Sequence, residues 1–243
     1  MATDSAAPTA AWPVLQPNER RVLGVLVEKA KTTPDAYPLT LNALVTGCNQ
    51  KNNRDPVTSL DEVDVEQAVA ALKKLGLVQQ ITGSGRTDKY RHVVYDAWKV
   101  DKVQLAILAE LLLRGPQTEG ELRGRASRME PIPDLEQLRT QLKALSERGL
   151  VVYLSPEGRR GTIVTHGFHA PEELQRQRLR AEVADGSSSE AVDHRPASAP
   201  RSASLLESRV DALERELATL KGALAALEAR LTAAGLTAPS KME

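Results

Sequence analysis

Basic side chains gather at three places in the chain, and arginine is well suited to holding a phosphate group. The segment TEGELRGRASRM, residues 118–129, contains two glutamates and three arginines, which are Arg123, Arg125 and Arg128. The others lie on two predicted hairpins. The eight candidates for contacts with the phosphates of double-stranded DNA are Arg86, Lys89, Arg91, Arg123, Arg125, Arg128, Arg159 and Arg160. A solvated, self-compensated surface is the equal alternative, since Glu121 lies one helical turn before Arg125.

A polar loop, CNQKNNRDP at residues 48–56, is a second candidate binding segment. Its amide and basic side chains could hold a small anion or a partner's loop, and they are Asn49, Gln50, Lys51, Asn53 and Arg54. They could instead satisfy backbone groups within the long connection that spans residues 49–61. We favour this structural role, because a connection of that length needs internal hydrogen bonds.

Residues with catalytic or metal-binding potential do not form a recognisable set. Cys48 is the single cysteine and has no histidine beside it in sequence, so we expect a small buried thiol. His166 and His169 have the spacing of metal ligands, but no cluster completes a set of three or four. We therefore predict a protein that is not an enzyme and that has no metal site and no cofactor.

An internal repeat shows which elements carry these residues. Residues 65–92 align with residues 138–165 without a gap, at an offset of 73 positions. Each copy predicts a helix ending at a glycine (Gly76 or Gly149), then a strand, a turn and a second strand. The second strands are predicted within KYRHVVY and GTIVTH.

Two further helices precede each copy, at 18–30 and 40–48, and at 101–114 and 118–128. Three helices followed by a β-hairpin predict a mainly α fold of the α+β winged-helix class, with two tandem winged helix-turn-helix domains and a C-terminal coiled-coil helix. The expected segments are a disordered arm at 1–16, winged-helix domains at 17–98 and 99–169, a short helical extension and flexible linker at 170–204, a coiled-coil helix at 205–236 and a disordered tail at 237–243.

Acidic residues begin both predicted third helices, the helices that usually read DNA bases. The acidic residues near the start of the first are Asp61, Glu62, Asp64 and Glu66, and those of the second are Asp134 and Glu136. Acids at a helix N-terminus stabilise the helix dipole but repel phosphates. This pattern weakens the DNA hypothesis and favours its alternative, a scaffold that binds protein partners.

The sequence resembles the uncharacterised bacterial YceH family. The resemblance rests on TTPDAYPLTLNALVTGCNQKNNRDPV (32–57) and LLLRGPQTEGELRGRASRM (111–129), and it extends over nearly all of 17–169. It implies two tandem winged-helix domains followed by a less similar tail. It implies no activity, because the function of that family is unassigned, so no catalytic residue can be carried over.

The C-terminal tail contains a heptad pattern. After a linker rich in Ser, Ala and Pro, apolar residues recur with alternating spacings of four and three, at Leu206, Val210, Leu213, Leu217, Leu220, Leu224, Leu227 and Leu231. We predict that this helix forms a parallel coiled coil and makes the protein a homodimer. A trimer is the alternative, because leucine at both seam positions does not fix the number of strands.

Composition restricts the remaining classes. Among 243 residues, 32 basic side chains balance 32 acidic ones, which argues against a strongly basic coat for nucleic acid. The longest nearly apolar run has eight residues, so we expect no membrane contact. A lone cysteine fits a reducing compartment, and we predict the cytoplasm. The expected function is regulatory DNA binding, with a protein-binding scaffold as the alternative.

Overall fold

The computed structural model describes residues 12–82, 87–159 and 161–186. We call residues 17–98 the first half and residues 99–169 the second half. The first half contains α1 (Pro17–Thr32), the 3-10 helix η1 (Pro34–Ala36), β1 (Leu39–Thr40), α2 (Leu41–Cys48), α3 (Glu62–Lys74), β2 (Val78–Thr82), β3 (Asp88–His92) and α4 (Val94–Trp98). The second half contains α5 (Lys102–Arg114), β4 (Gln117–Thr118), α6 (Glu119–Ala126), α7 (Leu135–Glu147), β5 (Val151–Tyr153) and β6 (Ile163–His166), and α8 (Pro171–Gly186) follows it.

The second and third helices of both halves begin at residues whose side chains cap them. Thr40 and Thr118 accept hydrogen bonds from backbone amides three residues later, each at 3.3 Å. Asp61 and Asp134 do the same for α3 and α7, each at 2.8 Å. Each cap satisfies an amide that the helix itself leaves unpaired. The predicted starts of these helices are therefore confirmed.

Each half contains a three-stranded antiparallel sheet, with the orders β1-β3-β2 and β4-β6-β5. The strands β1 and β4 were not predicted, because two residues are too few to show an alternating pattern. The register also corrects the gap-free repeat. Val78 pairs with His92 and Val151 pairs with His166, so the second hairpin is one residue longer than the first. The one-to-one alignment therefore holds through the first strand of each hairpin and slips by one in the second.

The predicted strand KYRHVVY is too long. Strand β3 ends at His92, and the short helix α4 begins at Val94. Val94 and Trp98 lie four residues apart and are both buried, so they share the inward face of that turn. The β-branched residues favour a strand locally, but burial of the Trp98 ring against Phe168, at a centroid distance of 4.7 Å, accompanies a helical turn instead.

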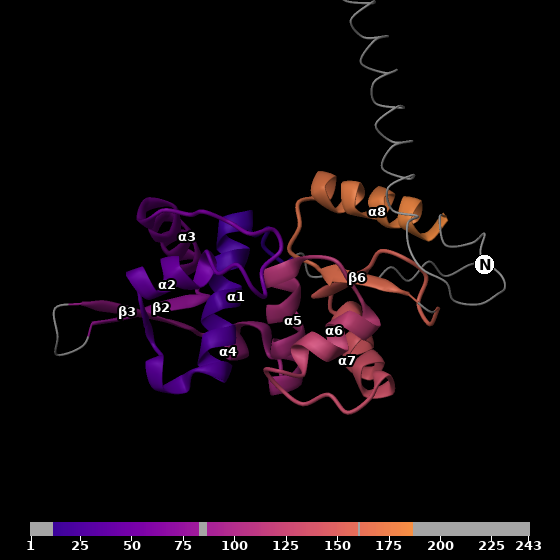
Figure 1. The fold of residues 1–243 in the computed structure, drawn as a ribbon, viewed down its shortest axis with the longest axis horizontal. Helices are drawn as coiled ribbons and strands as arrows, with labels where there is room; N and C mark the ends of the chain where they lie inside the picture. The colour runs from indigo at the N-terminus through magenta and orange to yellow at the C-terminus, as the bar shows by residue number, and fades with distance from the viewer. Residues whose placement is uncertain (1–11, 83–86, 160, 187–243) are drawn as a thin grey trace, which may run out of the picture. The chain divides into compact units, whose positions relative to one another are not determined.

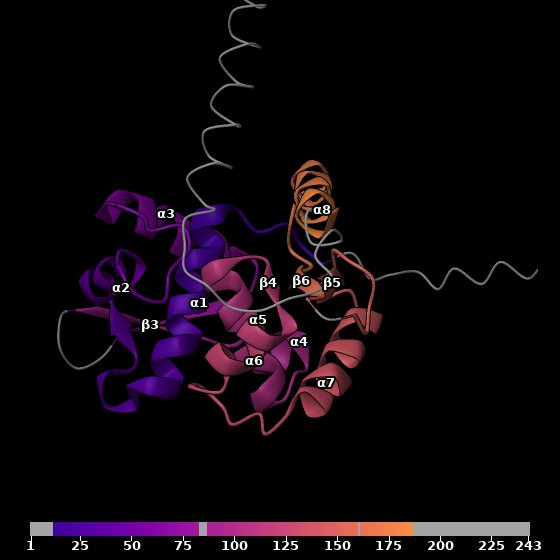
Figure 2. The same ribbon diagram turned by 45° about the vertical axis from the view of Figure 1, so that its right-hand side comes forward.

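The hydrophobic core is continuous across the two halves, which lie within one compact unit. Helices α1 and α5, the first helices of the two halves, lie side by side in the centre (Figure 1, Figure 2). Gly24 on α1 makes this approach possible, because a Cβ atom there would lie 2.8 Å from Cγ of Leu113. The central contact thus needs a residue without a side chain.

The segment before α1 corrects one expectation. Residues 12–16, predicted as part of a disordered arm, lie against the second half. Trp12 donates its ring N–H to the carbonyl oxygen of Arg148 at 2.7 Å, and the buried Leu15 donates its backbone N–H to that of Phe168 at 3.0 Å. Two apolar side chains with accessible partners are enough to hold this short stretch.

The predicted linker and coiled coil lie outside the described residues, apart from the helical extension, which is α8. The heptad positions Leu206 to Leu231 are therefore not described, and neither are Arg86 and Arg160. In the part of the chain that is described, no helix has both the length and the apolar character needed to cross a membrane.

Candidate functional site

The three arginines of residues 118–129 are all bound within the protein. Arg123 donates to the carbonyl oxygens of Ile132 and Pro133, at 3.3 and 3.1 Å. Arg125 donates to the side-chain oxygen of Gln117 at 2.7 Å and forms an ion pair with Glu121. These two guanidinium groups already have acceptors, so a phosphate would have to compete for them.

Arg128, the third of them, connects the two halves. Its guanidinium donates to Oδ1 of Asn53 at 2.6 Å and lies 3.6 Å from the buried carboxylate of Glu110. Arg114 donates to the same oxygen of Asn53 at 3.1 Å and lies 3.1 Å from Glu110. Burial raises the pKa of Glu110, and the nearby arginines oppose this rise. Arg128 and Arg114 thus hold the polar loop of the first half against the second half.

The hairpin residues are more accessible. Lys89 and Arg91 are exposed on β3, where Arg91 donates twice to Oε1 of Gln79, at 2.9 and 2.6 Å. Arg159 is exposed in the turn before β6. The hairpins β2–β3 and β5–β6 lie at opposite ends of the described structure in Figure 1. The basic residues of the two hairpins therefore do not form one continuous surface.

The polar loop is held largely by its own side chains. Arg54 is buried and binds both carboxylate oxygens of Glu28, at 3.2 and 2.6 Å, and also the carbonyl oxygen of Gly47. Asn49 accepts from the backbone N–H of Leu60 and donates to its carbonyl oxygen. Gln50 accepts from Arg54 at 3.1 Å, whereas Lys51 is exposed. Four of the five candidate residues thus make internal contacts of the structural kind that we favoured.

The start of α3 is an accessible acidic surface around an apolar side chain. Glu62 and Glu66 are exposed, and Asp64 caps the helix by accepting from the backbone N–H of Asp61. Between them Val63 exposes 57% of its surface. We call Glu62, Val63 and Glu66 the α3 patch. Such a patch repels phosphates and suits a partner that is basic and partly apolar.

A cleft between the halves contains charged groups that sequence reasoning missed. Arg20 on α1 is buried, donates to Nδ1 of His169 at 2.6 Å and forms an ion pair of 2.8 Å with Glu173 on α8. Because arginine can only donate, this nitrogen of His169 accepts, and its other nitrogen faces the hydroxyl of Thr165 at 2.9 Å. Burial lowers the pKa of His169, so its ring is neutral at pH 7.

The rings of His166 and His169 stack with centroids 4.0 Å apart. Burial and the neighbouring His169 lower the pKa of His166 well below its ordinary range. The pKa of Glu173 is lowered although burial raises it, because Arg20 donates a hydrogen bond to the carboxylate and places a positive charge beside it. His166 and His169, whose spacing resembles that of metal ligands but for which we predicted no metal site, both line this cleft. Nothing in the sequence links these histidines to Arg20, which lies beside the apolar residues of the predicted first helix.

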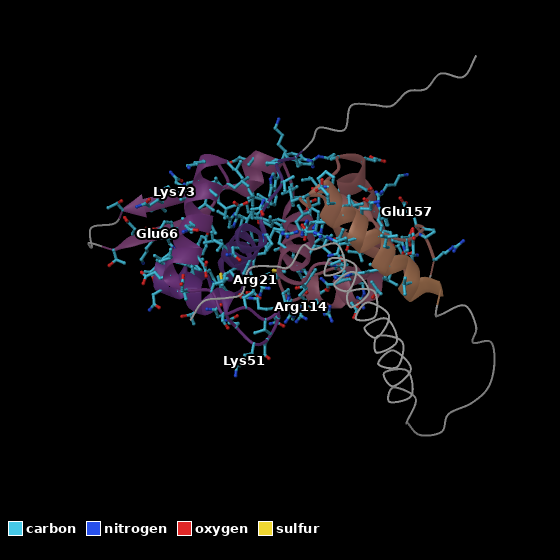
Figure 3. The ribbon with its side chains drawn as sticks, turned by 90° about the horizontal axis from the view of Figure 1, so that it is seen from above. Arg21, Lys51, Glu66, Lys73, Arg114 and Glu157 are labelled. Carbon is cyan, nitrogen blue, oxygen red and sulfur yellow. The ribbon has the colours of Figure 1, made fainter. Side chains whose placement is uncertain are left out.

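The cleft has a volume of about 400 Å³. Four arginines line it, from α1, from the C-terminal end of α5 and from α8, and they are Arg20, Arg21, Arg114 and Arg180. Figure 3 labels Arg21 and Arg114 at the junction of the two halves. We call this the junction cleft. Its lining has two carboxylates, Asp55 and Glu173, against these four arginines.

Comparisons with known proteins place the chain in a family. The family described as "Protein of unknown function, DUF480" matches residues 15–159. A UPF0502 protein of Rhodopirellula baltica is 54% identical over 159 residues, which cover 65% of this chain and 67% of that protein. A UPF0502 protein of Xanthomonas campestris is 42% identical over 224 residues, which cover 92% and 96%. YceH is a member of the UPF0502 family, so the resemblance seen in the sequence is confirmed.

Among solved structures, the chain is similar to subunit VPS25 of the endosomal trafficking complex ESCRT-II. The match has a TM-score of 0.23 and 16% sequence identity, and it covers 65% of this chain and 92% of that one. A similarity of this size supports no statement about function.

Proposed function

The chain belongs to the UPF0502 family of proteins of unknown function, and we propose that it is a non-enzymatic protein of two tandem winged helices that docks onto protein partners. The order of elements supports the winged-helix assignment, since each half has three helices and then a hairpin that joins a three-stranded sheet. Cys48, the single cysteine, is poorly suited to act as a nucleophile. Its thiol is buried, and burial raises its pKa to about 12.

The α3 patch carries the proposal of protein docking. In a DNA-binding winged helix, the N-terminal end of the third helix contacts base edges in the major groove. Here that end presents Glu62 and Glu66 around the exposed Val63. Carboxylates at this position oppose the phosphates of a duplex. An apolar centre with an acidic rim is instead typical of a surface for a protein with basic side chains.

DNA binding is the second candidate function. It rests on Lys89, Arg91 and Arg159, which are exposed on the hairpins. Arg123, Arg125 and Arg128 support it less, because their guanidinium groups are used within the protein. A duplex would therefore be held by few contacts, at two ends of the molecule.

We also propose that the protein is a homodimer and works in the cytoplasm. The heptad seam from Leu206 to Leu231 supports dimerisation, because a second copy is the natural partner for a narrow apolar stripe. The free, buried Cys48 is compatible with a reducing compartment. Sedimentation equilibrium on the full chain and on a chain ending at Ser202 tests the dimer: truncation should give a monomer. An unchanged dimer after truncation would exclude the tail as the interface.

The docking proposal is tested by capture from native cytosol with the tagged full-length protein. We expect one or more proteins to be retained by the wild type and lost with Val63→Lys, because the new charge opposes a basic partner. Glu136→Lys is the matched control, since residue 136 is the exposed position of α7 that aligns with residue 63. We expect the Glu136→Lys variant to retain the same proteins as the wild type.

A labelled DNA duplex at low salt tests the second candidate. If the protein docks onto proteins and does not bind DNA, we expect no salt-sensitive association with the duplex. If a duplex binds, weakens steeply with salt and is released by replacing Lys89 and Arg91 with alanine, the DNA function replaces the docking proposal.

A further inference from the structure

We propose that the junction cleft binds the phosphate group of a small molecule, either free phosphate or a small phosphomonoester. This site is separate from the α3 patch, and the inference does not depend on the docking proposal. It rests on the buried Arg21, which lacks an ion-pair partner among the described residues, on the directions from which the lining arginines come, and on the size of the cleft.

Arg21 carries most of the argument. Only 4% of its surface is exposed, and its guanidinium donates to two neutral acceptors, the carbonyl oxygens of Cys48 at 3.5 Å and Pro56 at 2.5 Å. In the described part of the chain no carboxylate forms an ion pair with it. Burial and the neighbouring Arg54 lower the pKa of Arg21, whereas the more distant carboxylates of Asp55 and Glu28 oppose this change. A buried cation is costly unless an anion accompanies it, and the cleft beside Arg21 is open to an anion.

The charges of the lining add to this effect. Four arginines face the cleft against two carboxylates, and the histidines His166 and His169 are neutral at pH 7 because burial lowers the pKa of both. Glu173 is already paired with Arg20. The first turn of α1 also lines the cleft through Pro17 and Asn18, and the N-terminal end of a helix favours an anion. Arg114 is paired with Glu110, which lies outside the lining, so among the described residues Arg21 and Arg180 are the lining arginines without an ion pair.

The arrangement favours phosphate over a carboxylate. A carboxylate presents two oxygens in one plane and matches a single guanidinium fork. Arg21, Arg114 and Arg180 reach the cleft from three different helices. A tetrahedral phosphate offers three oxygens in different directions, which suits donors that converge in this way.

The size of the cleft indicates a small molecule. A volume of about 400 Å³ lies within the usual range of small-molecule sites and exceeds that of a phosphate group alone. Thr58 and Gln177 line the same cleft and supply uncharged polar groups. They are suited to the hydroxyls of a sugar-sized remainder.

The test is titration calorimetry and thermal denaturation of the full-length protein at pH 7.5 and constant ionic strength. The probes are millimolar inorganic phosphate, ribose 5-phosphate and succinate. We expect both phosphates to bind and to raise the melting temperature, and succinate to do neither. Tighter binding of ribose 5-phosphate identifies a phosphomonoester as the ligand, and equal binding identifies free phosphate. Absence of binding by both phosphates, or equal binding of succinate, overturns the proposal.

Two variants connect the binding to the cleft. Arg21→Leu should weaken phosphate binding by about tenfold or more. It also removes the hydrogen bonds to the carbonyl oxygens of Cys48 and Pro56, so the melting temperature of the unliganded variant is measured beside its affinity. Since Arg21 is buried, Arg180→Ala serves as the second variant, and its exposed position on α8 makes it safe for folding. It should weaken binding about threefold.

Arg178→Ala is the matched control, because Arg178 is an exposed residue of α8 that does not line the cleft. It should bind phosphate as the wild type does. Equal affinities of the wild type, Arg21→Leu and Arg180→Ala would place the phosphate elsewhere and overturn the proposal.

Discussion

The two halves differ most in how they connect their second and third helices. In the first half residues 49–61 make a long loop, and in the second half residues 127–134 make a short connection. The long loop has a buried ion pair at its centre, between Arg54 and Glu28. In the short connection, the carbonyl oxygens of Ile132 and Pro133 accept hydrogen bonds from Arg123, which belongs to the preceding helix α6. The longer loop is thus stabilised by a stronger internal contact than the shorter one.

Both connections reach the other half, and they meet where Asn53 of the long loop accepts from Arg128 of the short one. Asn53 has a left-handed backbone conformation, with φ of 60°, and accepts from Arg114 and Arg128. The backbone N–H of Asp55 donates to the carbonyl oxygen of Leu113 at 3.1 Å. The insertion therefore joins the halves. Its polar composition reflects this task, which was not evident from the sequence.

The largest expected effect comes from breaking the anchor of the long loop. Arg54→Ala should destabilise the protein by about 3–5 kcal/mol, because it leaves the carboxylate of Glu28 buried without its partner. Arg123→Ala, the corresponding change in the short connection, should cost only about 1–2 kcal/mol for the lost hydrogen bonds. Urea denaturation of the three proteins measures both values.

Similar costs for the two variants would remove the distinction between the connections. The double variant Glu28→Leu with Arg54→Met sharpens the test, since it removes both charges together. It should recover most of the stability that Arg54→Ala loses, because a packed apolar pair often replaces a buried ion pair without loss.

The two halves can also be compared in their sensitivity to acid. His92 and His166 occupy equivalent sheet positions, each paired with the first residue of the preceding strand. Burial lowers the pKa of His92 to about 4. The unfolded chain therefore takes up the proton first as the pH falls. The stability due to neutral His92 is complete above about pH 6.5 and is lost as the pH falls toward 4.

At pH 5 the loss due to His92 should be about 2 kcal/mol relative to pH 7.5. His92→Phe keeps a ring beside Tyr37 and Tyr95 and should reduce the fall in unfolding free energy between these two pH values by that amount. Tyr95→Phe leaves the imidazole in place and should keep the wild-type fall. If His92→Phe also keeps it, the acid sensitivity belongs to other groups, with His166 and His169 of the second half foremost.

The smallest expected effect concerns the caps of the third helices. Asp61 and Asp64 exchange hydrogen bonds with each other's backbone amides at the start of α3, whereas Asp134 makes a single cap at α7. Asp61→Ala and Asp134→Ala should each cost about 1 kcal/mol, with the larger loss at Asp61 because it removes a reciprocal cap. Thermal denaturation followed by circular dichroism measures the order. A larger loss at Asp134 would contradict it.

Local features of the sequence predicted much of the fold. Thr40, Asp61, Thr118 and Asp134 marked helix starts correctly, because a cap involves residues only three positions apart. The sequence could not show contacts between distant residues. Arg54 meets Glu28 across 26 positions, and Arg20 meets Glu173 across 153. A charged residue beside an apolar stripe, such as Arg20, is expected from the sequence to be solvated. Its buried partners become visible only in the fold, and for this reason the sequence did not predict the junction cleft.

The central contact between α1 and α5 joins corresponding helices of the two repeats. A contact between corresponding helices is also found in twofold-symmetric dimers. An ancestral chain of one half would have had the same apolar helix available for self-association. Gene duplication and fusion would then make that association permanent and independent of concentration. The insertion at residues 49–61, present in one repeat only, is the kind of asymmetry that becomes available once the two copies share one gene.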